Sequence, residues 1–468
     1  MSESLPLRDL GIQLIYLASA LCFIFGLRGL SHPEKARGGM TLAAFGMLLA
    51  VVGTLLHLEI VRFDWLIAGL LIGSFIGVVI GRPLFITVPM TAMPQWVALS
   101  HAAGAVAATL VGVNEYLILK GAVSHGTMAA LGFEVGLGAL TVTGSVMAFG
   151  KLQEIFPGRP VTWPLQNAGN FILLGGALGL IILLTVNPSL SWAFWILVAI
   201  ATLLGVLMVL PIGGADMPVV ISLLNAYAGL SASAMGFALD NNLLIVVGAL
   251  DGTSGFLLSV LMCKAMNRSF ANVLFGAFGG QSGAASKAAV GGDMRAISPA
   301  DAAVQLGYSG LVIVVPGYGL AVAQAQHALR ELTDLLEKRN VEVKYAIHPV
   351  AGRMPGHMNV LLAEAGVPYD KLYDMEEINA EFNRCDVALV IGANDVVNPA
   401  ARTDPASPIY GMPILDVDKA GSVMVLKRGR GAGFAGIENE LFFNPKTSML
   451  FGDAKESLTK LVGEVKTL

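Results

Sequence analysis

The chain has 468 residues, of which 55% are hydrophobic and only 13% are charged, and its formal net charge is −4 at pH 7. This apolar composition is typical of membrane proteins, and the small net charge argues against a nucleic-acid-binding protein. The three cysteines are scattered without a Cys-x-x-Cys pair, which predicts neither a disulfide framework nor a metal site.

The charged residues divide the chain into two parts. Residues 1–275 carry 11 Lys/Arg and 11 Asp/Glu, whereas the remaining 193 residues carry 18 and 22. The first part has membrane composition and the second has globular composition. The N-terminus contains acidic residues and no small-residue cleavage site, so we expect neither a transit peptide nor a cleaved signal. We predict a transmembrane domain over 1–275, a linker over 276–300 and a soluble domain over 301–468.

Nine segments are long and apolar enough to cross a bilayer, since a helical span needs roughly 20 apolar residues. Gly- and Ala-rich stretches at 99–112 and 132–144 would let helix backbones approach closely, which predicts a packed bundle. The predicted spans are roughly 10–30, 39–58, 64–81, 94–118, 126–150, 169–187, 191–210, 216–238 and 242–266.

Basic residues in the loops predict the topology. An odd number of spans places the termini on opposite sides, and the side richer in Lys and Arg is the cytoplasmic one. Only Arg8, Arg62 and Lys120 fall on the side opposite the C-terminal domain, which we therefore expect in the cytoplasm. The basic residues on the side of that domain are Arg28, Lys35, Arg37, Arg82, Lys151, Arg159, Lys264 and Arg268.

His101 and Asn225 are polar residues inside predicted spans, where an ionisable side chain costs at least ~2.5 kcal/mol. Each lies roughly 10–13 Å from the predicted cytoplasmic start of its helix, so the two could face each other. Asp216 is out of phase with Asn225, and we expect it at the cytoplasmic mouth. Histidine titrates near physiological pH, so His101 is either a proton relay or a hydrogen-bonded structural histidine.

Two acidic residues, Glu134 and Asp251, also fall near the middle of predicted spans. Each is either protonated or paired there for a function, or is a hydrogen-bonded packing residue, and the sequence leaves both roles open. His57 and His125 lie near span ends, where we expect an interfacial position.

The region from Gly276 reads GAFGGQSGAASKAAVGGDMRAISPADAA. It is rich in Gly, Ala and Ser and has no periodicity, which predicts a flexible connection. A domain carried on such a linker could move relative to the membrane.

Beyond the linker, an apolar β-branched run at 311–315 precedes a Pro-Gly-Tyr-Gly turn and a helical pattern over 319–340. This order of strand, glycine turn and helix is typical of dinucleotide-binding domains. Strands alternating with helices predict a Rossmann-like domain with a parallel, doubly wound sheet. The further predicted strands are 341–347, 386–391, 412–417 and 422–427, and the further helices are 355–366, 374–384 and 454–467.

Four turns then lie at the carboxyl ends of the strands, where such sheets bind their ligands: 317–319, 350–355, 392–395 and 427–430. Glycines 317 and 319 would let the backbone approach a pyrophosphate at a helix N-terminus. Val322 replaces the third glycine of the fingerprint, so a glycine turn without a nucleotide is the alternative.

The last of these turns, Lys427-Arg428-Gly429-Arg430, carries three cations in four residues and could bind an additional phosphate. The alternative is a solvated basic turn. The second strand ends in His348-Pro349-Val350 and lacks the acid typical of an NAD site, so both features favour NADP. No nucleophile, triad or metal-ligand spacing stands out, because His327, His348 and His357 are dispersed. Hydride chemistry supplied by the cofactor is therefore the simplest hypothesis.

The chain contains the motifs IGGADMPVVISLLNAYAG, MCKAMNRSF, PGYGLAVAQAQ, VAGRMPGHMNVLLAEA, GANDVVNPAA, KRGRGAGFAG and LFFNPKTSMLFGDAK. Together these motifs resemble those of one family, the β subunits of proton-translocating NAD(P) transhydrogenases. The resemblance implies that this chain carries NADP(H) and most of the membrane domain, in a bacterial cytoplasmic (inner) membrane. It also implies an α subunit that carries NAD(H) and a few more helices, and a symmetric higher oligomer, a dimer of αβ units.

The resemblance also implies roles for individual residues, including a proton pathway through His101, Asp216 and Asn225. Lys427 and Arg428 match the site for the 2′-phosphate, and Phe434 stands where the family usually has Tyr. The family binds NADP in a reversed orientation, for which an acid after the second strand is not diagnostic. The implied cofactor site comprises Gly317, Tyr318, Gly319, Val350, Ala351, Gly352, Arg353, Met354, Pro355, Gly392, Asn394, Asp395, Gly411, Met412, Lys427, Arg428, Gly429, Arg430, Phe434, Asp453 and Ala454.

Two other functions remain open from the residues alone. One is a transporter or channel gated by a nucleotide-sensing cytoplasmic domain, and the other is an NADP reductase that is merely anchored in the membrane. One glycine turn serves one cofactor, so a transhydrogenase requires a partner chain with a second dinucleotide site. Polar residues inside the spans argue against a simple anchor.

Overall fold

The computed structural model of the chain forms two compact units, Met1–Pro211 with Val220–Leu257 and Ile212–Val219 with Leu258–Leu468. Most of the predicted linker, residues 276–293, lies outside the described residues, as do Met354, Pro355, Arg430 and Phe434 of the predicted cofactor site. The described residues are 7–30, 33–56, 63–81, 88, 92–119, 123–157, 161–213, 216–266, 270, 273, 294–353, 356–405, 407, 409–429 and 437–468.

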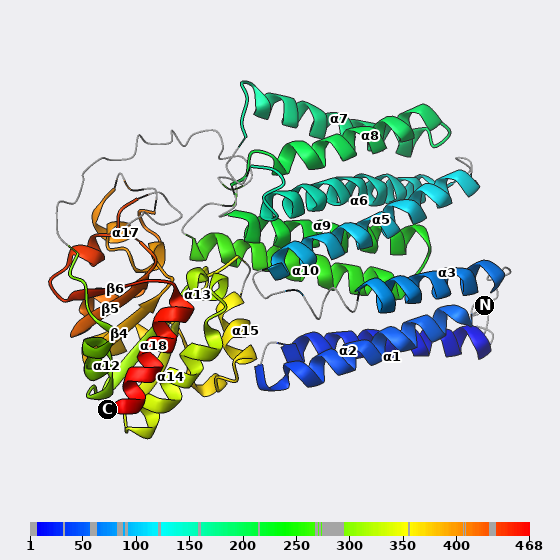
Figure 1. The fold of residues 1–468 in the computed structure, drawn as a ribbon. Coiled ribbons are helices and arrows are strands. Elements are labelled where there is room, and N and C mark those ends of the chain that lie inside the picture. Colours follow the sequence, from blue (N-terminus) through cyan, green and yellow to red (C-terminus); the bar gives the residue numbers. More distant parts are fainter. Residues whose placement is uncertain are drawn as a thin grey trace. The chain divides into compact units, whose positions relative to one another are not determined.

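In the described part of the chain, eight helices are long and apolar enough to cross a membrane (Figure 1). A shorter apolar segment, α3 (Phe63–Phe75) with the π-helix η1 (Ile76–Gly81), coincides with the third predicted span. All nine predicted spans thus coincide with helical segments, and the predicted polytopic helical class is confirmed. The eight helices are α1 (Leu7–Leu30), α2 (Pro33–Leu55), α5 (Met93–Leu119), α6 (His125–Leu152), α7 (Gln166–Val186), α8 (Ser191–Val209), α9 (Met217–Ala238) and α10 (Asn242–Ala265).

Glycines set the spacing between several of these helices. A Cβ atom on Gly229 of α9 would lie 2.2 Å from the backbone nitrogen of Gly252 in α10. A Cβ atom on Gly205 of α8 would lie 2.2 Å from the carbonyl oxygen of Leu140 in α6. No side chain fits at these distances, so the helices pack backbone to backbone, as the small-residue stretches predict.

The C-terminal part contains a six-stranded sheet in which every strand pair is parallel, in the order β3-β2-β1-β4-β5-β6. This is the order of a doubly wound dinucleotide-binding sheet, and the predicted Rossmann-like class is confirmed. The strands are β1 (Leu311–Pro316), β2 (Glu342–Ile347), β3 (Leu372–Asp374), β4 (Val387–Ile391), β5 (Ser422–Lys427) and β6 (Thr447–Phe451).

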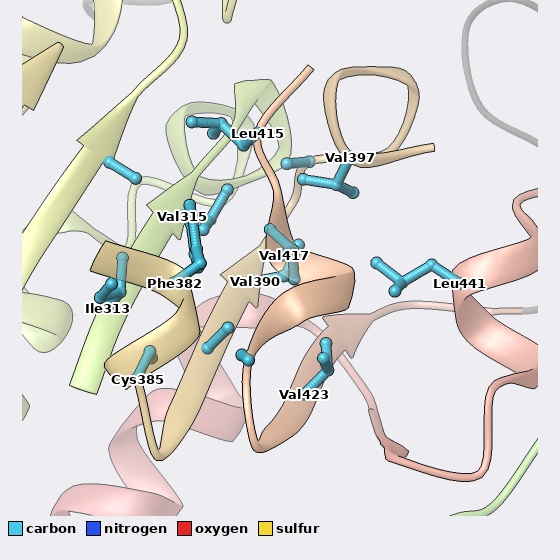
Figure 2. Packing of buried hydrophobic residues seen from close by; sticks show 14 of the residues in the cluster. Ile313, Val315, Phe382, Cys385, Val390, Val397, Leu415, Val417, Val423 and Leu441 are labelled. Carbon is cyan, nitrogen blue, oxygen red and sulfur yellow. The ribbon is translucent and has the colours of Figure 1, made fainter. Parts of the chain in front are cut away.

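Helices cover both faces of this sheet. On one face α12, α14 and α18 pack against one another (Figure 1). On the other face the short helices η6, η8 and η9 contribute Phe382, Val417 and Leu441 to a core that also contains Ile313 and Val390 (Figure 2). The helices are α12 (Pro299–Gly307), α13 (Tyr318–Val322), α14 (Gln326–Lys338), α15 (His357–Glu364), η5 (Tyr369–Lys371), α16 (Met375–Ile378), η6 (Glu381–Arg384), η7 (Asp395–Val397), α17 (Ala400–Thr403), η8 (Val417–Lys419), η9 (Glu440–Phe443) and α18 (Ala454–Thr467).

The central strands are buried on both faces, which explains their unbroken apolar sequences. Every residue of β1 and β4 is buried. Cys385 lies in the same core, and burial raises the pKa of its thiol to about 12. A thiol held protonated in this way acts as a small apolar core residue.

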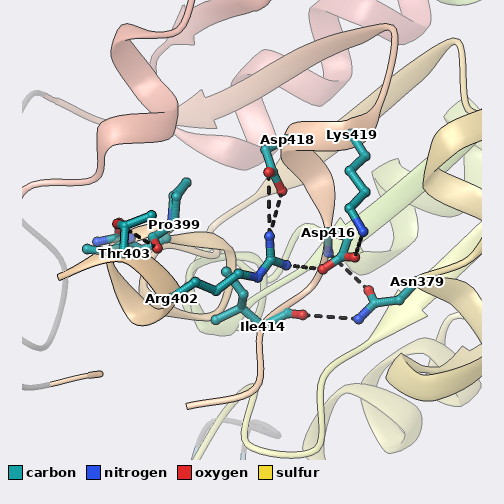
Figure 3. Close-up of polar contacts among 10 residues, drawn as sticks. Asn379, Pro399, Arg402, Thr403, Ile414, Asp416, Asp418 and Lys419 are labelled. Atoms are coloured by element: carbon teal, nitrogen blue, oxygen red, sulfur yellow. Dashed lines mark hydrogen bonds and ion pairs between the residues drawn. The ribbon is translucent and has the colours of Figure 1, made fainter. Parts of the chain in front are cut away.

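The predicted strand at 412–417 is wrong. Residues 412–416 belong to no strand and Val417 begins η8, and the backbone of this segment pairs with side chains and loops (Figure 3). Asn379 Nδ2 donates to the carbonyl of Ile414 at 3.1 Å, and Asn379 Oδ1 accepts from the N–H of Asp416 at 3.0 Å. One asparagine side chain thus replaces a neighbouring strand, an interaction that the local sequence pattern does not reveal.

Two predicted helices are interrupted, and two strands were missed. The predicted helix 319–340 is two helices, α13 and α14, because Gln324 adopts a left-handed conformation with φ of 47°. The predicted helix 374–384 is reduced to α16 and the 3-10 helix η6. The missed strands β3 and β6 have three and five residues and lie at the two edges of the sheet.

Candidate functional site

The four predicted turns lie at one edge of the sheet, because each follows the carboxyl end of a parallel strand. Strand β1 pairs with β2 on one side and with β4 on the other. Strands β2 and β3 therefore lie on one side of β1, and β4, β5 and β6 lie on the other side, so the strand order reverses at β1. The boundary between β1 and β4 is the switch point at which such folds bind ligands.

At this boundary the turn after β1 packs directly on the turn after β4. The N–H of Gly317 donates to the carbonyl of Ile391 at 2.8 Å, and that of Gly319 donates to the carbonyl of Gly392 at 3.0 Å. A Cβ atom on Gly317 would lie 2.4 Å from the Gly392 oxygen, and one on Gly319 would lie 2.7 Å from the Gly392 Cα. The packing of the two turns thus explains these glycines, and their contact with a pyrophosphate stays a prediction.

The turn after β2 contains a buried histidine in place of an acid. His348 Nε2 donates to the carbonyl of Pro413 at 2.8 Å, and its Nδ1 accepts from the N–H of Val350 at 3.2 Å. Burial lowers the pKa of His348 to about 4, although the Pro413 carbonyl opposes this shift. His348 is therefore neutral at pH 7, with its proton on Nε2, and it fixes the start of the turn.

A second buried histidine brings three segments together at this edge. The N–H of Arg353 donates to His357 Nδ1 at 3.0 Å, and the guanidinium carbon of Arg353 lies 4.7 Å from the centre of the Tyr318 ring. The Tyr318 and His357 rings meet edge to face with centres 6.0 Å apart. Burial first, and then the Arg353 charge, lower the pKa of His357 to about 4. The sequence prediction includes Tyr318 and Arg353 but misses His357.

Gly352 in the same turn is required for this arrangement. Its φ is +117°, and an added Cβ atom would lie 2.5 Å from the Cβ of His357. The predicted residues Val350 and Ala351 precede it, and Ala351 is buried. His357 therefore packs where a side chain at position 352 would otherwise stand.

The turn after β4 is held by an asparagine that the sequence prediction also misses. Asn439 is buried, and its Nδ2 donates to the carbonyl oxygen and to Oδ1 of Asn394, at 2.9 and 3.1 Å. Its Oδ1 accepts from the N–H of Leu441 at 3.0 Å. Asn398, which is fully buried, donates to the carbonyl of Glu438 at 3.0 Å. These amides fix the 437–441 segment to the β4 turn.

The basic turn after β5 begins with a half-buried cation. Lys427 Nζ lies 5.4 Å from the centre of the Phe442 ring. Burial lowers the pKa of Lys427, and the carboxylate of Asp395 opposes this shift. Asp395 and Lys427, from the turns after β4 and β5, therefore interact, while Arg428 and Gly429 are exposed.

The last predicted cofactor residues, Gly411, Met412, Asp453 and Ala454, have structural roles. Gly411 has φ of +77°, and its N–H donates to the carbonyl of Ala401 at 2.8 Å. Met412 packs against a small core cluster that includes Ala401. Asp453 caps α18, which begins at Ala454, by accepting from two backbone N–H groups at 2.9 and 3.3 Å. A cofactor contact of these residues stays a prediction.

In the membrane part, two residues of the predicted proton pathway, His101 and Asn225, both interact with Asp251. Asn225 of α9 donates from Nδ2 to Oδ1 of Asp251 in α10, at 3.3 Å. His101 of α5 lies close enough to Asp251 for their charges to interact. Its buried Nδ1 has no hydrogen-bond partner among the described residues. Asp251, whose role the sequence leaves open, is thus the shared partner of His101 and Asn225.

Close packing of α9 on α10 makes this contact possible. A Cβ atom on Gly255 would lie 2.8 Å from Asn225 Nδ2, so the glycine leaves room for the amide. Asp216 lies immediately before α9, where its N–H donates to the carbonyl of Gly213 at 3.1 Å. Asp216 is therefore separate from the contact between Asn225 and Asp251, as predicted from the different helix faces of Asp216 and Asn225.

Comparison with known proteins agrees with these two parts. A family model described as "NAD(P) transhydrogenase beta subunit" matches residues 12–464. The chain is 50% identical over 456 residues to a protein of Rhodospirillum rubrum named NAD(P) transhydrogenase subunit beta, covering 96% of this chain and 97% of that one. The identically named protein from one strain of that species gives the same values. The chain is thus a membrane protein that belongs to the family of NAD(P) transhydrogenase beta subunits.

Proposed function

We propose that this chain binds NADP(H) at the carboxyl edge of its parallel sheet, and that the partner α subunit binds NAD(H). The observation that carries the proposal is the half-buried Lys427 with the exposed Arg428 next to it, at the end of β5. Two adjacent cations suit the phosphate that distinguishes NADP from NAD. Arg353, above Tyr318 in the turn after β2, provides a further cation at the same edge.

The described residues fit such a cofactor and supply no alternative chemistry of their own. Both histidines at this edge, His348 and His357, are buried and neutral at pH 7, so neither is a charged ligand or a ready proton donor. The nicotinamide itself supplies the hydride chemistry when bound. This chain's residues would hold and orient it and exclude water.

Proton movement, in this proposal, uses the His101, Asn225 and Asp251 cluster in the membrane. An imidazole beside a carboxylate and an amide can take up and release a proton near neutral pH. Protonation of His101 would then bias the helices leading to Asp216 and the linker. Through these helices and the linker, the NADP(H) domain would switch between a cofactor-exchanging state and an occluded, hydride-transferring state. Such coupling requires a structural element with two states, both of which the proton site and the cofactor site can influence.

The exposed side of α10 supports a partner in the membrane. Asp251 and Ser254, which lie about 60° apart around the helix, are both exposed on the surface of this single chain, near the middle of α10. Ionisable residues at this depth do not normally face lipid. We propose that helices of the α subunit, or of a second copy in a dimer of αβ units, cover this side.

The remaining parts of the proposal concern location and domain limits. The distribution of Lys and Arg in the loops supports a cytoplasmic C-terminal domain in a bacterial inner membrane. The change in charge density supports a membrane domain over 1–275, a linker over 276–300 and an NADP(H)-binding domain over 301–468.

Reconstitution with the α subunit tests the assignment of cofactors. The two chains should purify together, and the pair should reduce an NADP analogue with NADH, whereas neither chain should do so alone. Equilibrium titration of the β chain alone should give saturable binding of NADPH and much weaker binding of NADH. Turnover by the β chain alone, or equal affinity for the two nucleotides, would contradict the proposal.

A further inference from the structure

Glu134 of α6 is a buried carboxyl group that the cluster around His101 does not include. Its side chain is 0% exposed, and neither carboxylate oxygen has a hydrogen-bond partner among the described residues. A carboxyl group that serves only packing is normally hydrogen-bonded. Burying one without a partner destabilises the folded protein, because the group loses its hydrogen bonds to water and gains none in return. Packing alone therefore does not explain an acid at this position.

The space for this carboxyl group is formed by a glycine on the neighbouring helix. A Cβ atom on Gly112 of α5 would lie 2.8 Å from Oε1 of Glu134 and 2.9 Å from its Cδ. On the side of α9, Ser231 is buried and its Oγ donates to the Glu134 carbonyl at 2.8 Å. Glu134 thus lies where α5, α6 and α9 meet.

Further polar side chains lie along α5 on both sides of Gly112, namely Glu115 and Thr109. Glu115 is partly exposed and lies close enough to Glu134 for their charges to interact. Thr109 Oγ1 and Ser231 Oγ both face Gly138, at 2.4 and 3.2 Å from the position of a Cβ atom there. His101 lies further along α5, roughly 21 Å from Glu115 and within about 40° of the same helix face.

The other two helices packed on α6 lie against its opposite face. Ile181 of α7 and Leu197 of α8 face Gly132 and Gly136, which are two residues before and after Glu134 and point away from it. Among the described residues, the charged group that interacts with Glu134 is Glu115. A proton on the Glu134 carboxyl would relieve the repulsion between these two acids.

We propose that Glu134 is a second proton-binding site of the pathway, between Glu115 and the cluster of His101, Asn225 and Asp251. This inference rests on the proposed function, in which that cluster carries protons. A proton arriving from water at the Glu115 end forms an O–H bond with a carboxylate oxygen of Glu134. The bond breaks when the proton passes on to the His101 imidazole, through the hydroxyl groups of Thr109 and Ser231 or intervening water, and no electrons are transferred.

Glu134→Gln in the αβ complex, reconstituted into vesicles that contain a pH-sensitive dye, tests this role. Glutamine keeps the shape of a protonated glutamate but cannot exchange the proton. Proton translocation should fall by at least about a hundredfold, the scale of losing a proton-transfer group, while NADPH binding stays unchanged. Wild-type translocation by this variant would overturn the proposal, because a purely structural carboxylic acid is well replaced by the amide.

Thr141→Val is the matched control on α6. Thr141 is also fully buried, lies within about 20° of the same helix face, and already donates to the carbonyl of Leu137 at 2.7 Å. Its substitution should leave translocation at the wild-type level. If Glu134→Gln does not assemble, Glu134→Asp carries the test: translocation with a displaced pH profile supports the role, and an unchanged profile contradicts it.

His101→Ala, measured in parallel, separates this inference from the proposed function. Loss of translocation in His101→Ala with normal translocation in Glu134→Gln would overturn the role of Glu134 alone. Normal translocation in both variants would overturn the proposed function as well.

Discussion

Asn225 and Asp251 lie on adjacent membrane helices, and the amide Nδ2 of the first is 3.3 Å from Oδ1 of the second. This hydrogen bond leaves the other side of the Asp251 carboxylate available to interact with His101. A histidine on α5 is thereby linked through Asp251 to the helix that begins next to Asp216. In the proposed function, proton binding at His101 would therefore affect both α9, through Asn225, and α10, through Asp251.

Replacing the shared carboxylate should uncouple this cluster. Asp251→Asn keeps the size of the side chain but removes the charge beside His101, so we expect proton translocation to fall by about a hundredfold. NADPH binding to the αβ complex should be retained. The measurement is dye-monitored proton uptake by vesicles, with Thr253→Val as the control, because Thr253 is also exposed on α10 but lies about 160° around the helix from Asp251. Translocation within about twofold of wild type would exclude Asp251 from the pathway.

Substituting Gly392 should destabilise the carboxyl edge of the sheet. Its φ is +67°, and an added Cβ atom would lie 2.4 Å from the Cα of Gly319. We expect Gly392→Ala to lower the free energy of unfolding of the soluble domain by about 1–3 kcal/mol or more, and to weaken NADPH binding. Urea titration measures the first effect.

Gly463→Ala is the control for Gly392→Ala. Gly463 is exposed in the middle of α18, and an added Cβ atom there meets nothing within 4 Å. Alanine should stabilise this helix by about 0.5–1 kcal/mol. Equal effects of the two substitutions would show that the packing of the β1 and β4 turns is not the constraint.

Two buried histidines should make the soluble domain sensitive to acid. Burial lowers the pKa of His348 and His357 from 6.5 to about 4. The unfolded chain binds these protons near pH 6.5 and the folded domain only near pH 4, so stability is complete above pH 6.5 and falls as the pH drops towards 4. The loss is at most about 3 kcal/mol for each histidine.

Urea unfolding of the soluble domain at a series of pH values checks this expectation. His348→Gln keeps a donor for the Pro413 carbonyl and should reduce the pH dependence between 6.5 and 4 by about half. A stability profile that is flat over this interval in the wild-type protein would contradict burial of the neutral imidazoles.

Removing the cation at the end of β5 should weaken NADPH binding selectively. Lys427→Gln should raise the Kd for NADPH by about tenfold to a hundredfold, the effect of losing a charge-assisted hydrogen bond of about 1.5–3 kcal/mol. Binding of NADH, which lacks the 2′-phosphate, should change little. Lys460→Gln removes an exposed charge that pairs with Glu456 and should leave both affinities unchanged. Calorimetric titration distinguishes these outcomes, and an equal loss for both nucleotides would contradict a phosphate contact.

Much of the fold could be predicted from the sequence where one local signal dominates. Long apolar segments have no alternative to a membrane helix, and the β-branched runs of β1, β4 and β5 are buried on both faces of a parallel sheet. The 412–417 segment resembles a strand in its local sequence, but Asn379, distant in the sequence, supplies hydrogen bonds to its backbone. Short β3 and β6 depend on their neighbours for the same reason.

The candidate site shows the same limit. His101 and Asn225 could be identified because polar residues inside a bilayer are costly. That Asp251 joins them depends on the rotation and spacing of three helices, which the glycines at 229, 252 and 255 determine only in the folded bundle. His357 and Asn439 were missed because their roles arise from contacts with distant turns, not from a motif.

Proton translocation by the αβ complex with His101→Ala tests most directly whether this chain couples proton movement to bound NADP(H). Vesicles are supplied with NADPH and an NAD analogue, and the internal pH and the hydride transfer are recorded together. The wild-type complex should acidify or alkalise the vesicle interior as hydride is transferred. The His101→Ala complex should bind NADPH normally and move no protons, whereas proton movement at the wild-type rate in this variant would contradict the account.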